Sequence, residues 1–308
     1  MSDKTRKLIN HLQRLETESS NPKSLNIDRL PAVDICRIIN QEDQTVASAI
    51  AGQISIIAKT ADKVADIIRN GGGVFYIGAG TSGRLGVLDA AEIPPTFGTD
   101  PSLFTGVIAG GRDTLVLSKE GVEDETDQAK IDLAKFNLTT NDMLIGLAAS
   151  IKTPYTIAGI KYAQIVGAAT ALIVCNDACS LEIKPDFLIQ LKVGPEVITG
   201  STRMKSGTAQ KMTLNMISTT AMILLGKCYG NLMVDLKATS NKLKARSRKI
   251  LIELLEIDYD EADKLLEESG GSVKIAIAMR SLGIDGAEAE KRLGQSGGFL
   301  WKLLDQKQ

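Results

Sequence analysis

A turn of seven residues, GAGTSGR at 78–84, carries groups suited to binding phosphate. It follows a short apolar run and precedes a helical pattern, and it matches the glycine fingerprint of dinucleotide-binding proteins. That interpretation also requires an acidic residue at the end of the second strand, where the sequence reads VIAGGR and has no carboxylate before Asp113. Backbone N–H groups, the helix dipole and the hydroxyls of Thr81 and Ser82 favour a single phosphate monoester instead. The simpler alternative is a glycine turn in which Ser82 only caps the helix.

Two more hydroxyl-rich turns follow later apolar runs. Ser150 and Thr153 flank the start of a helical stretch, with Pro154 suited to its first turn. The segment GPEVITGSTRMK at 194–205 follows the fifth run and contributes Thr199, Ser201 and Thr202. Ligands of open α/β sheets bind beyond the carboxyl ends of the strands, so three such turns on one edge predict a polar, phosphorylated ligand. The P-loop pattern of nucleotide enzymes is absent.

Glu92 is one candidate for proton transfer, although a solvated carboxylate at the end of a helix is the simpler interpretation of an arbitrary glutamate. The neighbours of Glu92 are apolar, and a carboxyl in apolar surroundings is more readily kept protonated, as a general acid requires. Pro94 and Pro95 follow, and we expect them to end the helix. A helix that starts at Ser82 puts Glu92 about 15 Å further along its axis. We therefore expect either that the helix ends early and folds back, or that Glu92 serves the phosphate site of a partner subunit.

Further charged candidates are less distinctive. Glu123 lies in a run of acids between 120 and 127 that also fits a helix N-terminal charge cluster. Glu196 follows the fifth apolar run and is a candidate contact to sugar hydroxyls or an amide. Arg203 and Lys205 are candidate anchors for phosphate or carboxylate, although solvated positions in the first turn of a helix would explain them equally. The same reservation holds for Arg84.

Composition excludes several classes of function. The chain has 308 residues, 36 Lys and Arg against 37 Asp and Glu, and a net charge of −1, so no long-range field recruits nucleic acid or an acidic membrane. A single histidine, His11, argues against histidine-dependent catalysis and histidine-rich zinc sites, and no metal site or cofactor is predicted. Without an apolar signal segment or an 18-residue apolar run, we predict a cytoplasmic protein with four free thiols.

The apolar runs predict the architecture. Five of them, at 74–77, 104–109, 143–148, 170–175 and 187–193, alternate with helical stretches at 84–91, 126–136 and 154–166. The first four runs are almost continuously apolar, which is typical of strands buried on both faces of a parallel sheet. The sequence therefore predicts a doubly wound, five-stranded α/β layer.

The flanking segments are predicted as helical or irregular. Residues 1–31 are expected to form a loose polar lead-in, and 33–70 a helical stretch ended by three glycines. After residue 193 we predict long helices at 201–226 and 232–255, then short ones at 260–269, 272–281 and 286–295. This pattern suggests a domain over 1–250 and a small helical domain over 251–308. The alternative is that these last helices pack onto the sheet layer.

Several motifs together resemble the sugar isomerase (SIS) domain family of phosphosugar-binding proteins, and within it the N-acetylmuramic acid 6-phosphate etherases. The similarity runs from about residue 34 to 299 and rests on GAGTSGRLG at 78–86, LDAAEIPP at 88–95, EGVED at 120–124, GPEVITGSTRMK at 194–205, GTAQK at 207–211 and GNLMVD at 230–235. One departure is Ile151, where a glycine is expected in the family.

The resemblance implies an SIS-type sheet and a lyase that cleaves the D-lactyl ether of N-acetylmuramic acid 6-phosphate. Elimination and then hydration would give N-acetylglucosamine 6-phosphate and D-lactate in cell-wall sugar recycling. It implies Glu92 as acid and Glu123 as its partner, hydroxyls at Thr81, Ser82, Ser150, Thr153 and 199–202 around the substrate, no cofactor, and a homodimer. Two alternatives stay open: an aldose–ketose phosphosugar isomerase, and a non-catalytic phosphosugar-binding regulator, because the glucokinase regulatory protein shares this architecture without the chemistry.

Overall fold

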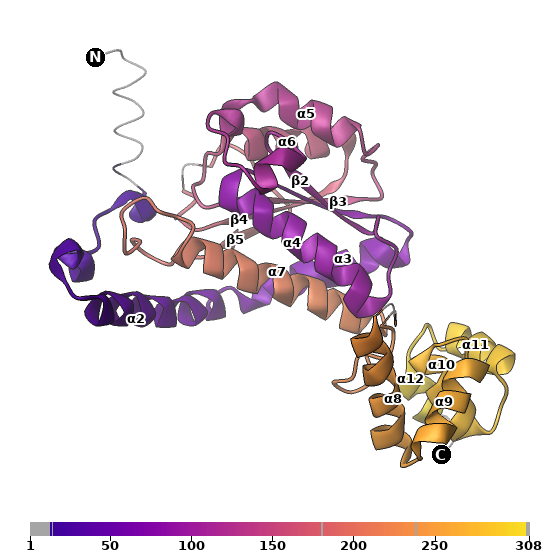
Figure 1. Cartoon of the computed structure of the whole chain (residues 1–308). Coiled ribbons are helices and arrows are strands. Elements are labelled where there is room, and N and C mark those ends of the chain that lie inside the picture. The colour runs from indigo at the N-terminus through magenta and orange to yellow at the C-terminus, as the bar shows by residue number, and fades with distance from the viewer. Residues whose placement is uncertain (1–12, 14, 180, 237, 239, 306–308) are drawn as a thin grey trace. The chain divides into compact units, whose positions relative to one another are not determined.

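The computed structural model describes residues 13, 15–179, 181–236, 238 and 240–305, so His11 lies outside the described residues. The chain forms two compact units (Figure 1). The first comprises residues up to 91 together with 102–217, and the second comprises 92–101 together with 218 onward. A domain boundary at residue 250 stays a prediction.

The first unit is built on a five-stranded parallel sheet in the order β2-β1-β3-β4-β5. Its strands are β1 (Val74–Gly78), β2 (Phe104–Ile108), β3 (Met143–Ala148), β4 (Ala169–Val174) and β5 (Phe187–Gln190). In the central register, Val74 pairs with both Phe104 and Met143. Strands β1 and β3 are buried throughout, as their continuous apolar sequences predict. The predicted α/β sheet is confirmed, although β5 ends three residues earlier than expected.

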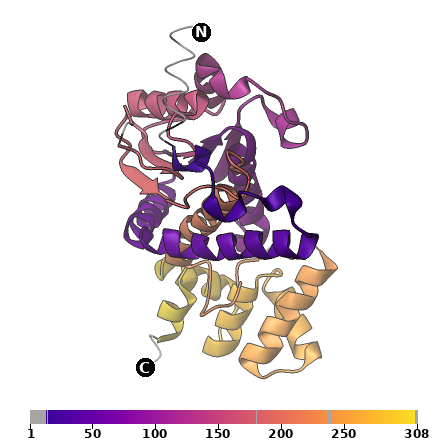
Figure 2. The same cartoon turned by 90° about the vertical axis from the view of Figure 1, so that its left-hand side faces the viewer.

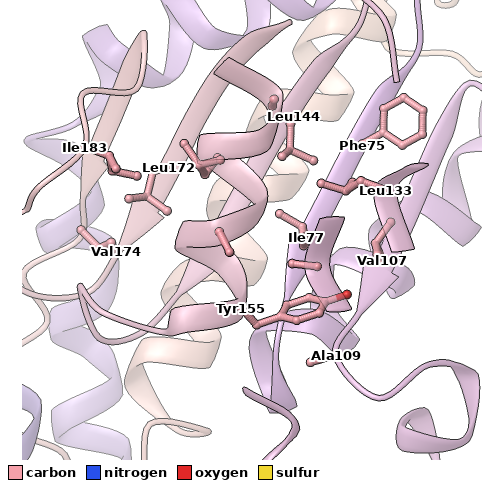
Figure 3. Close-up of a cluster of buried hydrophobic side chains, with 14 of the residues drawn as sticks. Phe75, Ile77, Val107, Ala109, Leu133, Leu144, Tyr155, Leu172, Val174 and Ile183 are labelled. Atoms are coloured by element: carbon pink, nitrogen blue, oxygen red, sulfur yellow. The ribbon is translucent and has the colours of Figure 1, made fainter. Parts of the chain in front are cut away.

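Helices cover both faces of this sheet. The helices of the first unit, two of which run on into the second, are α2 (Ala32–Ala51), α3 (Ile54–Arg69), α4 (Gly80–Phe97), α5 (Thr126–Ala134), α6 (Pro154–Val166) and α7 (Lys205–Leu224). Helices α5 and α6 pack on one face through a core that includes Ile77, Leu133 and Tyr155 (Figure 3). On the other face, Tyr76 donates to Asp89 of α4 at 2.9 Å. The sheet is therefore doubly wound, as predicted.

Residues 15–31, which precede α2, are more ordered than their polar sequence suggests. They contain three 3₁₀ turns, η1 (Glu16–Glu18), η2 (Pro22–Ser24) and η3 (Ile27–Arg29), which lead into α2, the long indigo helix of Figure 2. Thr17 is fully buried, and Asn176 Nδ2 donates to its Oγ1 at 3.0 Å. Ser24 Oγ donates to the Val197 carbonyl at 2.7 Å. The predicted loose lead-in is therefore wrong for these residues, because their polar groups are paired with distant parts of the chain.

The second unit ends in a helical cluster with its own apolar core, drawn in orange and yellow in Figure 1. Its helices are α8 (Asn241–Leu255), α9 (Tyr259–Glu268), α10 (Val273–Leu282), α11 (Gly286–Gln295) and α12 (Leu300–Asp305). The three short helices agree with the sequence to within a residue, because Asp258, Ser272 and Asp285 cap their N-termini. No helix in the described part of the chain is both long and apolar enough to cross a membrane.

The helix predicted at 232–255 is wrong in its first part. Leu232 forms a bridge with Tyr229 instead, and Asp235 accepts a hydrogen bond from Lys274 Nζ at 2.6 Å. Helix α8 begins only at Asn241, where the Ser240 hydroxyl accepts from the Leu243 amide. Tertiary pairing of Asp235 thus replaces a helical turn that the apolar spacing alone favours.

Candidate active site

The strand order creates a crevice at the carboxyl end of the sheet. Strands β1 and β3 are neighbours, yet β1 leads into α4 on one face and β3 leads into α6 on the other. Ligands of open α/β sheets bind at such a switch point. A cavity of about 380 Å³ lies there, lined by Glu18, residues 79–82, Arg84, Ala109, Thr114, 118–120, Val122, Glu123, Ala149, Ser150, 152–154 and Thr202. Its size lies within the usual range for a small-molecule site.

Glycines bring the first turn of α4 close to this cavity. Gly78 ends β1, and a side-chain carbon on Gly83 would come within 2.6 Å of the Gly78 carbonyl oxygen. Only glycine therefore lets the helix start directly over the strand end. Gly80 has φ +53°, and Thr81 and Ser82 follow it in the lining of the cavity. The free N–H groups of a first helical turn beside hydroxyl donors make an anion site.

The turn after β3 contributes a second helix N-terminus. Ser150 Oγ and Thr153 Oγ1 lie 3.3 Å apart, and Thr153 stands at the N-cap of α6 without its hydroxyl capping that helix. Both hydroxyls line the cavity, as does Thr202. Ile151 keeps only 2% of its surface exposed and packs in the core under α6. The branched side chain that departs from the family pattern therefore packs in the core and does not line the cavity.

Three acidic side chains line the same cavity, and two of them, Glu120 and Glu123, lie on the loop that follows β2. Glu123 is half-buried and sits on η5 (Val122–Asp124), one residue after Val122, which packs in the core. Gly121 precedes them with φ +85°. Glu120 lines the cavity as well. The geometry thus brings a carboxylate and the hydroxyl groups together, and the preference for Glu123 over Glu120 still rests on the family resemblance.

Glu92 is placed differently from expectation. Helix α4 does not end before Pro94 but continues through Pro95 to Phe97, and the Gly98 amide donates to the Pro94 carbonyl at 2.9 Å. The expectation that the helix ends early is therefore wrong, because the prolines occupy the last turn and cost the hydrogen bonds of that turn alone. Glu92 is exposed, so its apolar neighbours do not enclose it. It is not among the residues that line the cavity.

Two predicted substrate contacts are buried in the fold instead. Glu196 is fully buried and accepts hydrogen bonds from the amides of Lys205 and Ser206 at 2.9 and 3.0 Å, so it caps α7. Lys205 is 2% exposed, and its Nζ lies 2.7 Å from Glu42 Oε2. Neither lines the cavity. Thr199 and Ser201 also lie outside the lining, while Thr81, Ser82, Ser150, Thr153, Thr202 and Glu123 belong to it.

The cavity also contains residues that the sequence did not single out. Lys119 and Lys152 add positive charge to its lining, and Glu18 reaches it from η1. A side-chain carbon on Gly200 would come within 3.0 Å of Glu18 Oε2. The amide of Gly200 donates to the Thr17 carbonyl. The only sequence signal for Glu18 would have been the glycine that makes room for it.

Comparisons with known proteins agree on the family. A model of the glucokinase regulatory protein N-terminal SIS domain matches residues 56–164. An N-acetylmuramic acid 6-phosphate etherase of Rhodopirellula baltica is 52% identical over 88% of this chain and 90% of its own. Namesakes from Actinobacillus pleuropneumoniae (47% identical, 91% of each chain) and Vibrio vulnificus (46% identical, 96% of this chain and 99% of its own) match similarly. The chain therefore belongs to the N-acetylmuramic acid 6-phosphate etherase family.

Proposed function

We propose that this chain cleaves the D-lactyl ether of N-acetylmuramic acid 6-phosphate, giving N-acetylglucosamine 6-phosphate and D-lactate. The observation that carries the proposal is one cavity at the switch point of the sheet, where Ser82, Ser150 and Thr153 lie with Glu123. Close relatives over nearly the whole chain bear the name of this activity. The enzyme would work in the cytoplasm on sugars recovered from the cell wall.

The phosphate is held between two helix N-termini. First-turn N–H groups of α4 and α6 carry partial positive charge, and the hydroxyls of Ser82, Ser150 and Thr153 add donors of adjustable direction. Lys152, which lies between Ser150 and Thr153 in the sequence, also lines the cavity and supplies a full positive charge. Binding the phosphate at this end of the cavity leaves the sugar ring to extend toward the loop with Glu123.

The reaction needs one base and one acid. Opening of the sugar ring to the aldehyde acidifies the proton on carbon 2, and the Glu123 carboxylate removes it. The C3–O bond then breaks, and a carboxylic acid gives its proton to the departing lactate oxygen. Water adds to carbon 3 of the resulting alkene, and carbon 2 takes back a proton. Each proton transfer requires a group within hydrogen-bond reach and in the correct protonation state.

Glu92 is the proposed acid, contributed by the second subunit of a homodimer. It lies on α4 ten residues after Ser82, a distance of about 15 Å along a helix. A hexose phosphate bound at Ser82 does not span that length. A carboxyl exposed on its own subunit is free to enter a neighbouring site.

The first test is an assay for D-lactate on N-acetylmuramic acid 6-phosphate in buffer containing EDTA. We expect the wild type to release lactate and Glu123→Gln to lose about a hundredfold or more in kcat, as loss of a general base does. Glu125→Gln is the matched control, because Glu125 is exposed two residues away and does not line the cavity. Substrate binding without lactate release by the wild type would favour the regulator, and conversion of a phosphosugar aldose to a ketose would favour the isomerase.

A further inference from the structure

The side chain of Arg84 donates hydrogen bonds to a loop. Arg84 lies in the first turns of α4, two residues after Ser82, and is half-buried. Its Nη2 donates to the Thr114 carbonyl at 2.6 Å, and its Nε donates to the Leu115 carbonyl at 3.2 Å. These two bonds join residues that are 30 and 31 positions apart in the sequence. The guanidinium therefore fastens the start of α4 to the segment that follows β2.

That segment, residues 110–124, carries the candidate base and is anchored at few points. Gly110, Gly111 and Gly121 have φ values of +78°, +79° and +85°, so both ends bend through conformations that favour glycine. The Thr114 hydroxyl bonds the carbonyls of Ala109 and Gly111 at 3.0 and 2.7 Å. Near the far end, Val122 is 5% exposed in the core. We call this segment the Glu123 loop.

The middle of the Glu123 loop has little packing of its own. Val116 and Leu117 are 86% and 73% exposed. Arg84 grips the loop directly before these residues, at Thr114 and Leu115. An arginine suits this task because its planar guanidinium presents several donors in a fixed arrangement, whereas a lysine ammonium is one point charge on a flexible stem.

We propose that Arg84 is a positioning residue that fixes the Glu123 loop relative to the phosphate-binding turn. Because Arg84 and Ser82 share the first turns of one rigid helix, the clamp sets the separation between the phosphate site and Glu123. Arg84 lines the cavity, but two of its donors are directed at loop carbonyls. Its main contribution is therefore to the geometry of proton removal and not to phosphate affinity. This inference rests on the proposed function for its catalytic consequence.

The test compares Arg84→Met and Arg84→Lys with Arg112→Met, which removes an exposed cation of the same loop outside the cavity lining. We expect Arg84→Met to lower kcat by about a hundredfold, as a misplacement of about 1 Å does, with Arg84→Lys intermediate. The inhibition constant of inorganic phosphate should change less than about twofold, since no phosphate ligand is removed. Arg112→Met should behave as wild type.

A second readout does not depend on activity. Trypsin cuts after Lys119, which is exposed in the Glu123 loop, and we expect Arg84→Met to be cut there several-fold faster than the wild type, because a released loop fits a protease more readily. Thermal unfolding establishes that each variant is folded. If Arg84→Met does not fold, Arg84→Lys replaces it in the proteolysis experiment. A rise in the phosphate inhibition constant in step with the loss of kcat/KM would make Arg84 a phosphate ligand. If Arg84→Met is cut at Lys119 no faster than the wild type, the proposed clamp is wrong. This readout holds even if the wild type releases no lactate in the first assay.

Discussion

Lys205 Nζ lies 2.7 Å from Glu42 Oε2, and the two side chains keep only 3% and 6% of their surface exposed. Glu42 also accepts hydrogen bonds at 2.8 Å from Asn21 Nδ2 and Lys23 Nζ. The carboxylate therefore joins η2, α2 and the first residue of α7. Because Glu196 caps the same end of α7, the segment that carries Thr202 to the cavity is held by two buried glutamates.

This pair predicts a loss of stability in acid. Burial raises the pKa of Glu42, but hydrogen bonds from Lys205, Lys23 and Asn21 outweigh it and lower the pKa from 4.5 to about 2. A carboxyl with a depressed folded-state pKa stabilises the protein above the unfolded value and loses that contribution as the pH falls through the folded one. The contribution is on the order of 3 kcal/mol, since tenfold in proton affinity is worth about 1.4 kcal/mol. We expect it to disappear between pH 4.5 and about 2.

The measurement is the free energy of urea unfolding of the wild type and Glu42→Gln from pH 6 to 2. Glu42→Gln leaves Lys205 buried without its carboxylate, so we expect a loss of about 3–5 kcal/mol at pH 6. The difference between the two proteins should narrow toward pH 2. Glu125→Gln, at an exposed carboxyl, should follow the wild type throughout. A constant difference across the whole range would show that Glu42 does not carry the proposed linkage.

The packing around Gly83 leaves no room for a side chain. A side-chain carbon there would meet the Gly78 carbonyl oxygen at 2.6 Å and the Ile108 side chain at 2.7 Å. We expect Gly83→Ala to destabilise the first unit by about 1–3 kcal/mol through overpacking. Gly52 is the matched control, because a side-chain carbon there meets only the Ala49 carbonyl oxygen at 3.9 Å and its φ is −66°. Thermal unfolding of both variants checks this, and equal melting temperatures would contradict the close approach.

The sequence predicts the local features of this fold well. The strands are recognisable because a central parallel strand must be apolar on both faces, and β1 and β3 meet that requirement at every residue. Likewise, Ser272 and Asp285 signal helix starts through their immediate neighbours. Ser82, Ser150 and Thr153 could be assigned to one cavity because the ends of parallel strands share an edge. The strand and helix-start inferences depend on neighbouring residues alone, and the shared cavity follows from the general geometry of parallel sheets.

What the sequence could not show depends on distant pairing. Lys205 resembles a solvated first-turn lysine until the fold brings Glu42, 163 positions earlier, against it. Glu196 looks like a ligand-binding acid after a strand, yet it satisfies the free amides of α7. Arg84 gives no sequence signal of its clamp, because its acceptors are backbone carbonyls that any residue supplies. The roles of these charged residues are thus the hardest to predict, because they depend on partners that are distant in the sequence.

The hydroxyl candidates separate into two groups that kinetics can distinguish. Thr202 and Ser82 line the cavity, whereas Thr199 is exposed outside the lining. We expect Ser82→Ala and Thr202→Val each to raise KM and the inhibition constant of inorganic phosphate about tenfold, since a hydrogen bond to a charged group is worth about 1.5–3 kcal/mol. Thr199→Val should leave both constants unchanged. A larger effect at Thr199 than at Thr202 would mean that the substrate binds elsewhere on this loop.

The placement of Glu92 on α4 leads to a prediction about subunits. Ser82 and Glu92 lie on one continuous helix. The chain does not fold back between them, so they remain about 15 Å apart along the helix axis. Two subunits related by a twofold axis contact each other through the same surface, so any residue that one subunit contributes to its partner's site is contributed in return. Each would then give its Glu92 to the other, and both sites of the dimer would be composite.

Mixing two inactive variants tests this exchange directly. In a dimer of one Glu92→Gln chain and one Glu123→Gln chain, one site receives both mutations and the other receives neither. With random pairing, about half of the dimers are mixed and each has one intact site, so we expect recovery of about a quarter of the wild-type lactate release per chain. Subunits must first be exchanged by dilution and reconcentration, and each variant treated alone is the control for residual activity. If Glu92 instead serves the site of its own chain, every site in the mixture lacks one carboxyl, and activity stays at the level of the separate variants.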